Sequence, residues 1–177
     1  MTSARLRYQP VEPACLDAFH RLVQDAHVRR YLMDGNVFPR EWSEERMRDS
    51  QGLFERREVG IWLAYQKSTD DLVGFCGFLE IAAIDPEPQL VYALFERFTG
   101  QGLASEMARA SIAHARARPG FAEIVAAVDE INAASLRVLE KLGFEPSATR
   151  QGFFGNVLVF RLEAGRSTGL SHLDGAD

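Results

Sequence analysis

The sequence lacks several features that mark large classes of protein. No apolar run approaches the ~20 residues that a bilayer-spanning helix needs, and the N-terminus has no apolar stretch like that of a secretory signal peptide. The chain contains no Gly-Lys-Ser/Thr motif, and Gly100-Gln101-Gly102 is not followed by a third glycine at dinucleotide-binding spacing. These absences predict a cytoplasmic protein with no membrane partner, and they exclude P-loop NTPases and Rossmann dehydrogenases.

Cysteine and histidine are scarce among the 177 residues, with two and four copies. Cys15 and Cys76 are far apart, and Cys76 lies in an apolar run, which favours a buried structural thiol over a nucleophile or a disulfide bridge. The histidines show no metal-ligand spacing with each other or with the cysteines. No metal site is therefore predicted.

The chain also lacks the positive charge of a nucleic-acid-binding protein, because its net charge is −5 and its pI is about 5.4. Direct nucleic-acid binding is not expected. An acidic surface suits a cationic amine substrate, although mildly acidic proteins are common. Composition and length predict one globular domain over residues 1–164, followed by a polar, glycine-rich and disordered tail over 165–177.

A glycine-containing loop joins a predicted buried strand, Gln89–Phe95, to a predicted helix, Gln101–Ala117. Its sequence is Thr99-Gly100-Gln101-Gly102-Leu103-Ala104. Glycine lets a ligand approach the backbone closely, and the free N–H groups at a helix N-terminus bind phosphate. The segment therefore indicates a phosphate site, with an ordinary tight strand-to-helix connection as the alternative.

A second helix is predicted over Ala133–Leu142, after the apolar run 124–128. Asn132 is a suitable N-cap, Leu139 and other leucines share one face, and Gly143 is a natural stop. Each residue separately also fits a plain amphipathic helix.

Together the two segments resemble the GNAT acyltransferase superfamily over roughly residues 5–162. Thr99–Ala104 is similar to the family's pyrophosphate loop, commonly Gln/Arg-x-x-Gly-x-Gly/Ala, and Asn132-x-x-Ser135, running into Glu140-Lys141-Leu142-Gly143-Phe144, is similar to its second cofactor-contacting helix. The segments 5–7, 25–32 and 43–45 resemble the RimJ/RimL-type ribosomal-protein N-acetyltransferases. Two residues depart from the family pattern: Thr99 stands where Gln or Arg is frequent, and Leu139 stands where many members carry a tyrosine general acid.

The resemblance implies acetyl-CoA as co-substrate, with its pantetheine arm passing Leu94 and Asn132 and an oxyanion donor on the strand near Leu94 and Phe95. The implied cofactor-binding residues are Leu94, Phe95, Thr99, Gly100, Gln101, Gly102, Leu103, Ala104, Asn132 and Ser135. The implied reaction is direct attack of an amine on the thioester, and the implied acceptor is an α-amine, such as a peptide N-terminus, or a small amine metabolite.

Leu139 cannot donate a proton, so Ser135, one turn earlier on the same helix face, is the candidate acid; an unremarkable N3 serine is the alternative. Glu80 is the candidate base, with Glu87 second, although Glu80 also fits a solvent-facing strand position. Gln89 stands where relatives often carry glutamate, which leaves solvent, reached through Gln89 or Tyr92, as a further possibility.

The predicted fold is α/β (α+β), with a mixed, mostly antiparallel sheet of about six or seven strands and helices on both faces. The alternative function is a non-catalytic acyl-CoA-binding module. The sequence also allows an acyl donor other than acetyl-CoA, and it allows either a monomer or a homodimer. The remaining predicted elements are strands 5–8, 61–65, 72–81, 122–128, 144–148 and 153–162 and helices 13–27 and 44–56, the latter with Ser43 as N-cap.

Overall fold

A computed structural model describes residues 1–32, 35–152 and 155–163. The predicted end of the domain at residue 164 and the predicted tail over 165–177 lie outside these residues. In chain order the elements are β1 (Leu6–Pro10), η1 (Pro13–Cys15), α1 (Leu16–Gln24), α2 (Ala26–Leu32), α3 (Arg40–Arg57), β2 (Ile61–Gln66), β3 (Leu72–Leu79), β4 (Gln89–Leu94), η2 (Glu96–Phe98), α4 (Leu103–Arg116), β5 (Glu123–Asp129), α5 (Ala133–Lys141), β6 (Glu145–Gln151) and β7 (Asn156–Glu163).

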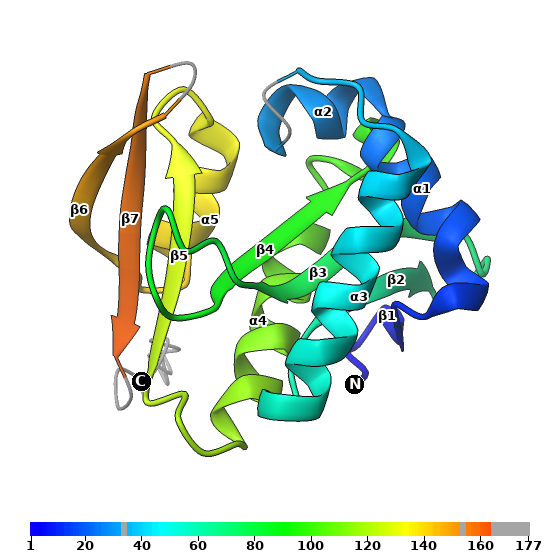
Figure 1. The fold of residues 1–177 in the computed structure, drawn as a ribbon, viewed down its shortest axis with the longest axis horizontal. Coiled ribbons are helices and arrows are strands. Elements are labelled where there is room, and N and C mark those ends of the chain that lie inside the picture. Colours follow the sequence, from blue (N-terminus) through cyan, green and yellow to red (C-terminus); the bar gives the residue numbers. More distant parts are fainter. Residues whose placement is uncertain (33–34, 153–154, 164–177) are drawn as a thin grey trace, which may run out of the picture.

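The strands form one seven-stranded sheet in the order β1-β2-β3-β4-β5-β7-β6. Every neighbouring pair is antiparallel except β4 with β5, which run parallel. Helices α1 and α3 pack against one face at β3, and α4 packs against β3 and β4 from the other face, while α5 lies beside β5 (Figure 1). The predicted fold class is confirmed.

The first predicted helix, 13–27, is divided by Asp25, which has an extended backbone. Its carboxylate accepts hydrogen bonds from the N–H groups of His27 at 3.0 Å and Val28 at 3.2 Å, so it caps α2 instead of continuing α1. The single helix expected from periodicity is wrong at this point, because the local side-chain bonds of aspartate compete with helix continuation.

Helix α3 begins at Arg40, after Pro39, and not at Glu44. The prediction that Ser43 is the N-cap is therefore wrong. Ser43 is a fully buried residue inside the helix, and its Oγ lies 2.8 Å from Nδ1 of His20 on α1. Ser43 thus joins α3 to α1, a contact between distant segments that helix-capping rules do not predict.

Two glycines allow β3 to lie very close to its neighbours. A Cβ on Gly74 would overlap the carbonyl oxygen of Ala93 and stand 2.7 Å from Cα of Leu94 on β4, whereas a Cβ on Gly77 would overlap the carbonyl oxygen of Gly60. Only glycine permits such backbone approach. The absence of a side chain at Gly74 therefore lets β3 lie close against β4 beside Leu94.

Strand β4 pairs with β5 at Gln89 and Leu90, and the two strands then diverge (Figure 1). Arg161 on β7 holds the paired end together, because its guanidinium binds Glu123 of β5 and also Asp85, in the loop before β4. The carboxyl end of β4 is consequently directed away from β5.

Cys76 is buried and free, as the sequence predicts for a structural thiol, and Cys15 is also buried and free. Burial raises the pKa of the Cys76 thiol to about 12, which keeps it protonated and unreactive near neutral pH. Within residues 1–32, 35–152 and 155–163, none of the helices has the length and apolar character that crossing a membrane requires.

Candidate functional site

The Thr99–Gly102 loop leaves the N-terminus of α4 open to a ligand. Gly100 and Gly102 have φ values of +72° and +74°, which glycine adopts without a Cβ penalty. Gly102 is the N-cap and provides no side-chain acceptor, and Glu106 is the first residue whose N–H closes a helical bond, to the Gly102 carbonyl at 3.2 Å. The backbone N–H groups before Glu106, including that of Leu103, therefore have no helical acceptor. They can donate to an anion at the positive end of the helix dipole.

Arg5, which immediately precedes β1, holds this loop. Its guanidinium donates to the Gln101 carbonyl at 2.9 Å and to Glu106 at 2.7 Å, and its main-chain N–H donates to Glu106 at 2.8 Å. The Ser3 hydroxyl also donates to Glu106 at 2.7 Å. Arg5 thus fixes the loop and places a positive charge beside Gly102, where a Cβ would lie 3.8 Å from its Nη2.

Burial alone would raise the pKa of Glu106, but hydrogen bonds from the Arg5 main chain, Ser3 and the Arg5 guanidinium lower it below the ordinary value of 4.5. The native state therefore gains stability from ionised Glu106 above about pH 4.5, and loses it as the pH falls through the lower folded pKa.

We expect Glu106→Gln to flatten the acid side of the stability curve. Urea unfolding between pH 7 and pH 3 measures this, since the difference between parent and variant should shrink as the pH falls below the ordinary carboxyl pKa. Glu55→Gln, at an exposed position of α3, is the control. A constant difference at every pH would contradict the prediction.

The backbone of β4 presents Leu94 towards the side from which β5 has diverged. The Phe95 N–H donates to the Val73 carbonyl of β3 at 3.0 Å. In an antiparallel pair, alternate residues direct their N–H groups to the same neighbour. The N–H groups of Tyr92 and Leu94 therefore face the β5 side. The Phe95 N–H is therefore already bonded within the sheet, whereas the Leu94 N–H faces the side from which β5 has diverged.

Helix α5 begins at Ala133, where the sequence predicts, and ends at Lys141, one residue before the predicted end. Oδ1 of Asn132, which is buried, accepts from the Ser135 N–H at 3.1 Å, and Gly143 follows the helix with φ +83°. Leu139 is 1% exposed and packs in the core, so this position contributes burial and no proton. Ser135 is partly exposed one turn earlier.

Tyr92 connects β4 to α5. Its hydroxyl lies 3.4 Å from the Ser135 carbonyl oxygen, and its ring packs against both buried clusters of the protein. Burial raises the pKa of the Tyr92 phenol to about 12. The group therefore remains a proton donor at neutral pH, on the same side of β4 as Leu94.

The two candidate carboxylates each form an ion pair. Glu80, just after β3, lies 2.8 Å from Arg56, and Glu87 lies 3.0 Å from Arg57; both carboxylates are about half exposed, at 49% and 51%. Exposed pairs of this kind are weak and open readily, so neither carboxylate is committed to its arginine.

Gln89 is a structural residue of the loop before β4. Its Oε1 accepts from the Ile81 N–H at 3.0 Å, and its Nε2 donates to the carbonyls of Asp85 and Glu87. The side chain is 1% exposed. Its hydrogen bonds shape the loop and leave it no role in carrying a proton from solvent.

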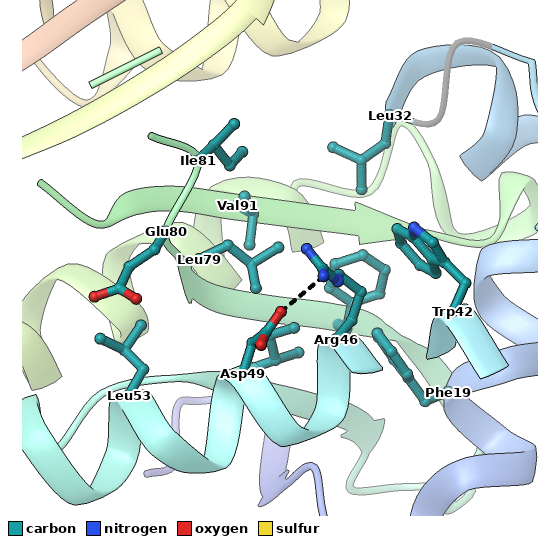
Figure 2. A pocket seen from close by; sticks show the side chains of 12 residues that line it. Phe19, Leu32, Trp42, Arg46, Asp49, Leu53, Leu79, Glu80, Ile81 and Val91 are labelled. Carbon is teal, nitrogen blue, oxygen red and sulfur yellow. Dashed lines mark ion pairs between the residues drawn. The ribbon is translucent and has the colours of Figure 1, made fainter. Parts of the chain in front are cut away.

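A cavity of about 330 Å³ lies on the opposite face of the sheet from α4, between α1, α3 and strands β3 and β4. Phe19, Trp42 and Phe75 provide aromatic surface. Val91 brings the cavity to β4, three residues before Leu94 (Figure 2).

Three charged side chains also line this cavity: Arg46, Asp49 and Glu80. Arg46 extends from α3 towards the sheet, and its Nη2 lies 2.9 Å from Asp49 (Figure 2). Among the described residues, His, Cys, Asp and Glu form no group of three or more that could hold a metal ion.

Sequence reasoning missed the cavity residues of α3, Trp42, Arg46 and Asp49, and the role of Arg5. The α3 segment has charge on nearly every side, and its sequence shows no apolar stripe that would mark Trp42 and Arg46 as lining one site. One usable signal was the tryptophan among charged residues, since an aromatic side chain in a polar helix often marks a contact surface.

Comparison with solved structures supports the same fold. An acetyltransferase from Agrobacterium tumefaciens strain C58 superposes with a TM-score of 0.77 at 21% identity, covering 92% of this chain and 93% of that one. RimL, a ribosomal L7/L12 alpha-N-protein acetyltransferase in complex with coenzyme A, superposes with a TM-score of 0.76 at 21% identity, covering 93% and 97%.

Sequence comparison identifies the family. The uncharacterised protein YkkB of Bacillus subtilis (strain 168) is 34% identical over 114 residues, which span 62% of each protein. The model of the acetyltransferase (GNAT) domain matches residues 5–145, well over half of the chain. The protein therefore belongs to the GNAT acetyltransferase family.

Proposed function

We propose that this protein is an N-acetyltransferase that moves the acetyl group of acetyl-CoA to an α-amine or a small amine by direct attack in a ternary complex. The observation that carries the proposal is the uncapped N-terminus of α4 behind Gly100 and Gly102. This phosphate-binding feature lies on the opposite face of the sheet from a cavity that reaches β4 near Leu94. A cofactor bound at the loop and an amine bound in the cavity would then meet beside β4.

In this proposal the pyrophosphate binds the loop Thr99, Gly100, Gln101 and Gly102 and the N–H groups of Leu103 and Ala104, with Arg5 adding charge. The pantetheine arm passes Leu94, Phe95 and Asn132, whose amide nitrogen can donate to it while Oδ1 caps α5. Ser135 lies on the same helix turn. The residues present suit a phosphorylated, amide-containing ligand.

The amine nitrogen forms a bond to the acetyl carbon, the carbon–sulfur bond breaks, and the amine gives its proton to solvent. The Leu94 N–H stabilises the developing oxyanion. The thiolate takes a proton from Ser135 or from Tyr92, whose phenol is held protonated next to the Ser135 carbonyl. Since a thiol of pKa about 8.5 is already a fair leaving group, modest assistance suffices.

Purified protein, acetyl-CoA and a panel of amines test the proposal through release of free thiol. Calorimetric titration with coenzyme A is run in parallel. Amine-dependent thiol release supports an acetyltransferase. Coenzyme A binding with no turnover on any amine supports the non-catalytic acyl-CoA-binding module. Faster thiol release from an acyl-CoA other than acetyl-CoA would change only the acyl group in the proposal.

Gly102→Ala is expected to weaken coenzyme A binding about tenfold or more, roughly 1.4 kcal/mol. The new Cβ would occupy open space beside Arg5, where the phosphate is proposed to bind. Alanine is chosen over the bulkier valine for this test, because φ at Gly102 is +74° and a β-branched residue is strongly strained there.

The matched control is Gly120→Ala, which has φ +83° and follows α4 at the end opposite to the loop. Both variants carry the cost of alanine in a left-handed conformation, about 1–2 kcal/mol. Calorimetry should show a loss of affinity in Gly102→Ala alone; equal affinities in both variants would refute the placement of the pyrophosphate.

A further inference from the structure

We infer that the cavity binds an α-amino acyl group, in which the carbon that bears the amine also bears an apolar side chain and a carbonyl group. The carbonyl oxygen accepts a hydrogen bond from Arg46. The inference rests on the proposed function and specifies its acceptor. A free amino acid, an amino-acid amide and a peptide N-terminus all contain this unit, so they are three sources of one chemistry.

The first observation is the position of the Arg46 guanidinium. Its Nη2 forms ion pairs with Asp49 at 2.9 Å and Glu45 at 3.3 Å, which fix the group. Arg46 lines the cavity, and 30% of its side chain remains exposed. A guanidinium held in this way can donate a hydrogen bond to a carbonyl oxygen that enters the cavity, and a hydrogen bond from a charged donor is stronger than one from a neutral donor.

The second observation is the apolar surface around this charge. Phe19 packs edge-on against Phe75 with ring centroids 5.6 Å apart, and Trp42 stacks on Phe38 at 4.5 Å. The Arg46 guanidinium lies 5.7 Å from the Trp42 ring. These contacts hold rigid aromatic walls beside the donor, so the side chain next to the carbonyl should be apolar.

The third observation is size and charge. A volume of about 330 Å³ is near the lower end of the ~300–1,000 Å³ found for ligand pockets, so it suits one residue-sized group. Asp49 and Glu80, although paired with Arg46 and Arg56, place carboxylate oxygens at the cavity that can accept hydrogen bonds from an amine. The cavity therefore offers Arg46 to the carbonyl oxygen, the aromatic walls to the apolar side chain, and the carboxylates to the amine.

The test compares Arg46→Met with the parent on phenylalaninamide and on phenethylamine, which lacks the carbonyl. Because the two amines differ in pKa, each is compared only with itself across variants. We expect kcat/KM to fall about tenfold or more for phenylalaninamide, as for loss of a hydrogen bond to a charged donor, and to change little for phenethylamine. Arg48→Met, exposed on the same helix, should change neither. Serinamide, with a polar side chain, should be acetylated more slowly than phenylalaninamide by the parent.

An equal fall for both amines, no fall for either, or faster acetylation of serinamide would overturn the inference. Binding of the product, N-acetylphenylalaninamide, gives a readout without turnover and should weaken about tenfold in Arg46→Met. If coenzyme A binds and no amine reacts, the proposed function fails, and product binding still tests the cavity on its own.

Free phenylalanine and a short peptide beginning with phenylalanine complete the panel. Preference for either supports the inference and identifies the source of the α-amino acyl group. Activity on phenethylamine without activity on these two and the amide would overturn it.

Discussion

Gly74→Ala is expected to lower the free energy of unfolding by about 3 kcal/mol or more, beyond the usual range for an overpacked site. The new Cβ would overlap the Ala93 carbonyl oxygen and approach Leu94 Cα to 2.7 Å, and both are main-chain atoms that no side-chain rotation can move. Strands β3 and β4 must then separate. For a protein of this size the melting temperature should fall by about 6–12 °C.

The matched control is Gly52→Ala in the interior of α3. There the new Cβ would meet only the flexible end of Arg56 at 3.0 Å, and alanine favours the helix by about 0.5–1 kcal/mol. The same chemical change should therefore have opposite signs at the two positions. Similar melting temperatures for the two variants would show that β3 and β4 are not as closely packed as the structure has them.

Local signals predicted the parts of the site that depend on local geometry. A glycine loop before a helix, and an asparagine before another, determine hydrogen bonds within a few residues, as Gly102 and the Asn132–Ser135 bond show. The succession of strands and helices along the chain also predicted a mixed sheet, although it gave no order of the strands within that sheet. The loop and cap features follow from backbone chemistry within one turn.

The remainder depends on contacts between distant segments. Arg5 binds Glu106 across about a hundred residues, and Ser43 binds His20 from another helix. The divergence of β5 from β4 beyond Leu90 arises from pairing between strands, which periodicity does not encode. Arg46 resembles any surface arginine in the sequence, and only packing places its guanidinium at the cavity.

The protein should acetylate α-amines in strong preference to lysine side chains at pH 7. The site has no evident strong base: Glu80, the candidate base, is half exposed and paired with Arg56, and Gln89 is engaged in its loop. The amine must therefore arrive neutral. Reference pKa values of about 7.7–8.0 and 10.4 make an α-amine ~200-fold or more richer in the neutral form than a lysine amine.

The measurement compares kcat/KM for a short peptide with a free N-terminus and for its N-blocked, lysine-containing counterpart. The rate with the α-amine should rise with pH and level off near pH 8, because neutral amine is then the main form. The rate with lysine should continue to rise about tenfold per unit up to pH 9, where its amine is still mostly protonated. Preference for the blocked lysine peptide at pH 7 would mean that a base has been overlooked. Glu80→Gln would then be the decisive variant, because removing that base should abolish the preference, whereas Glu87→Gln, its equally exposed counterpart, should leave it intact.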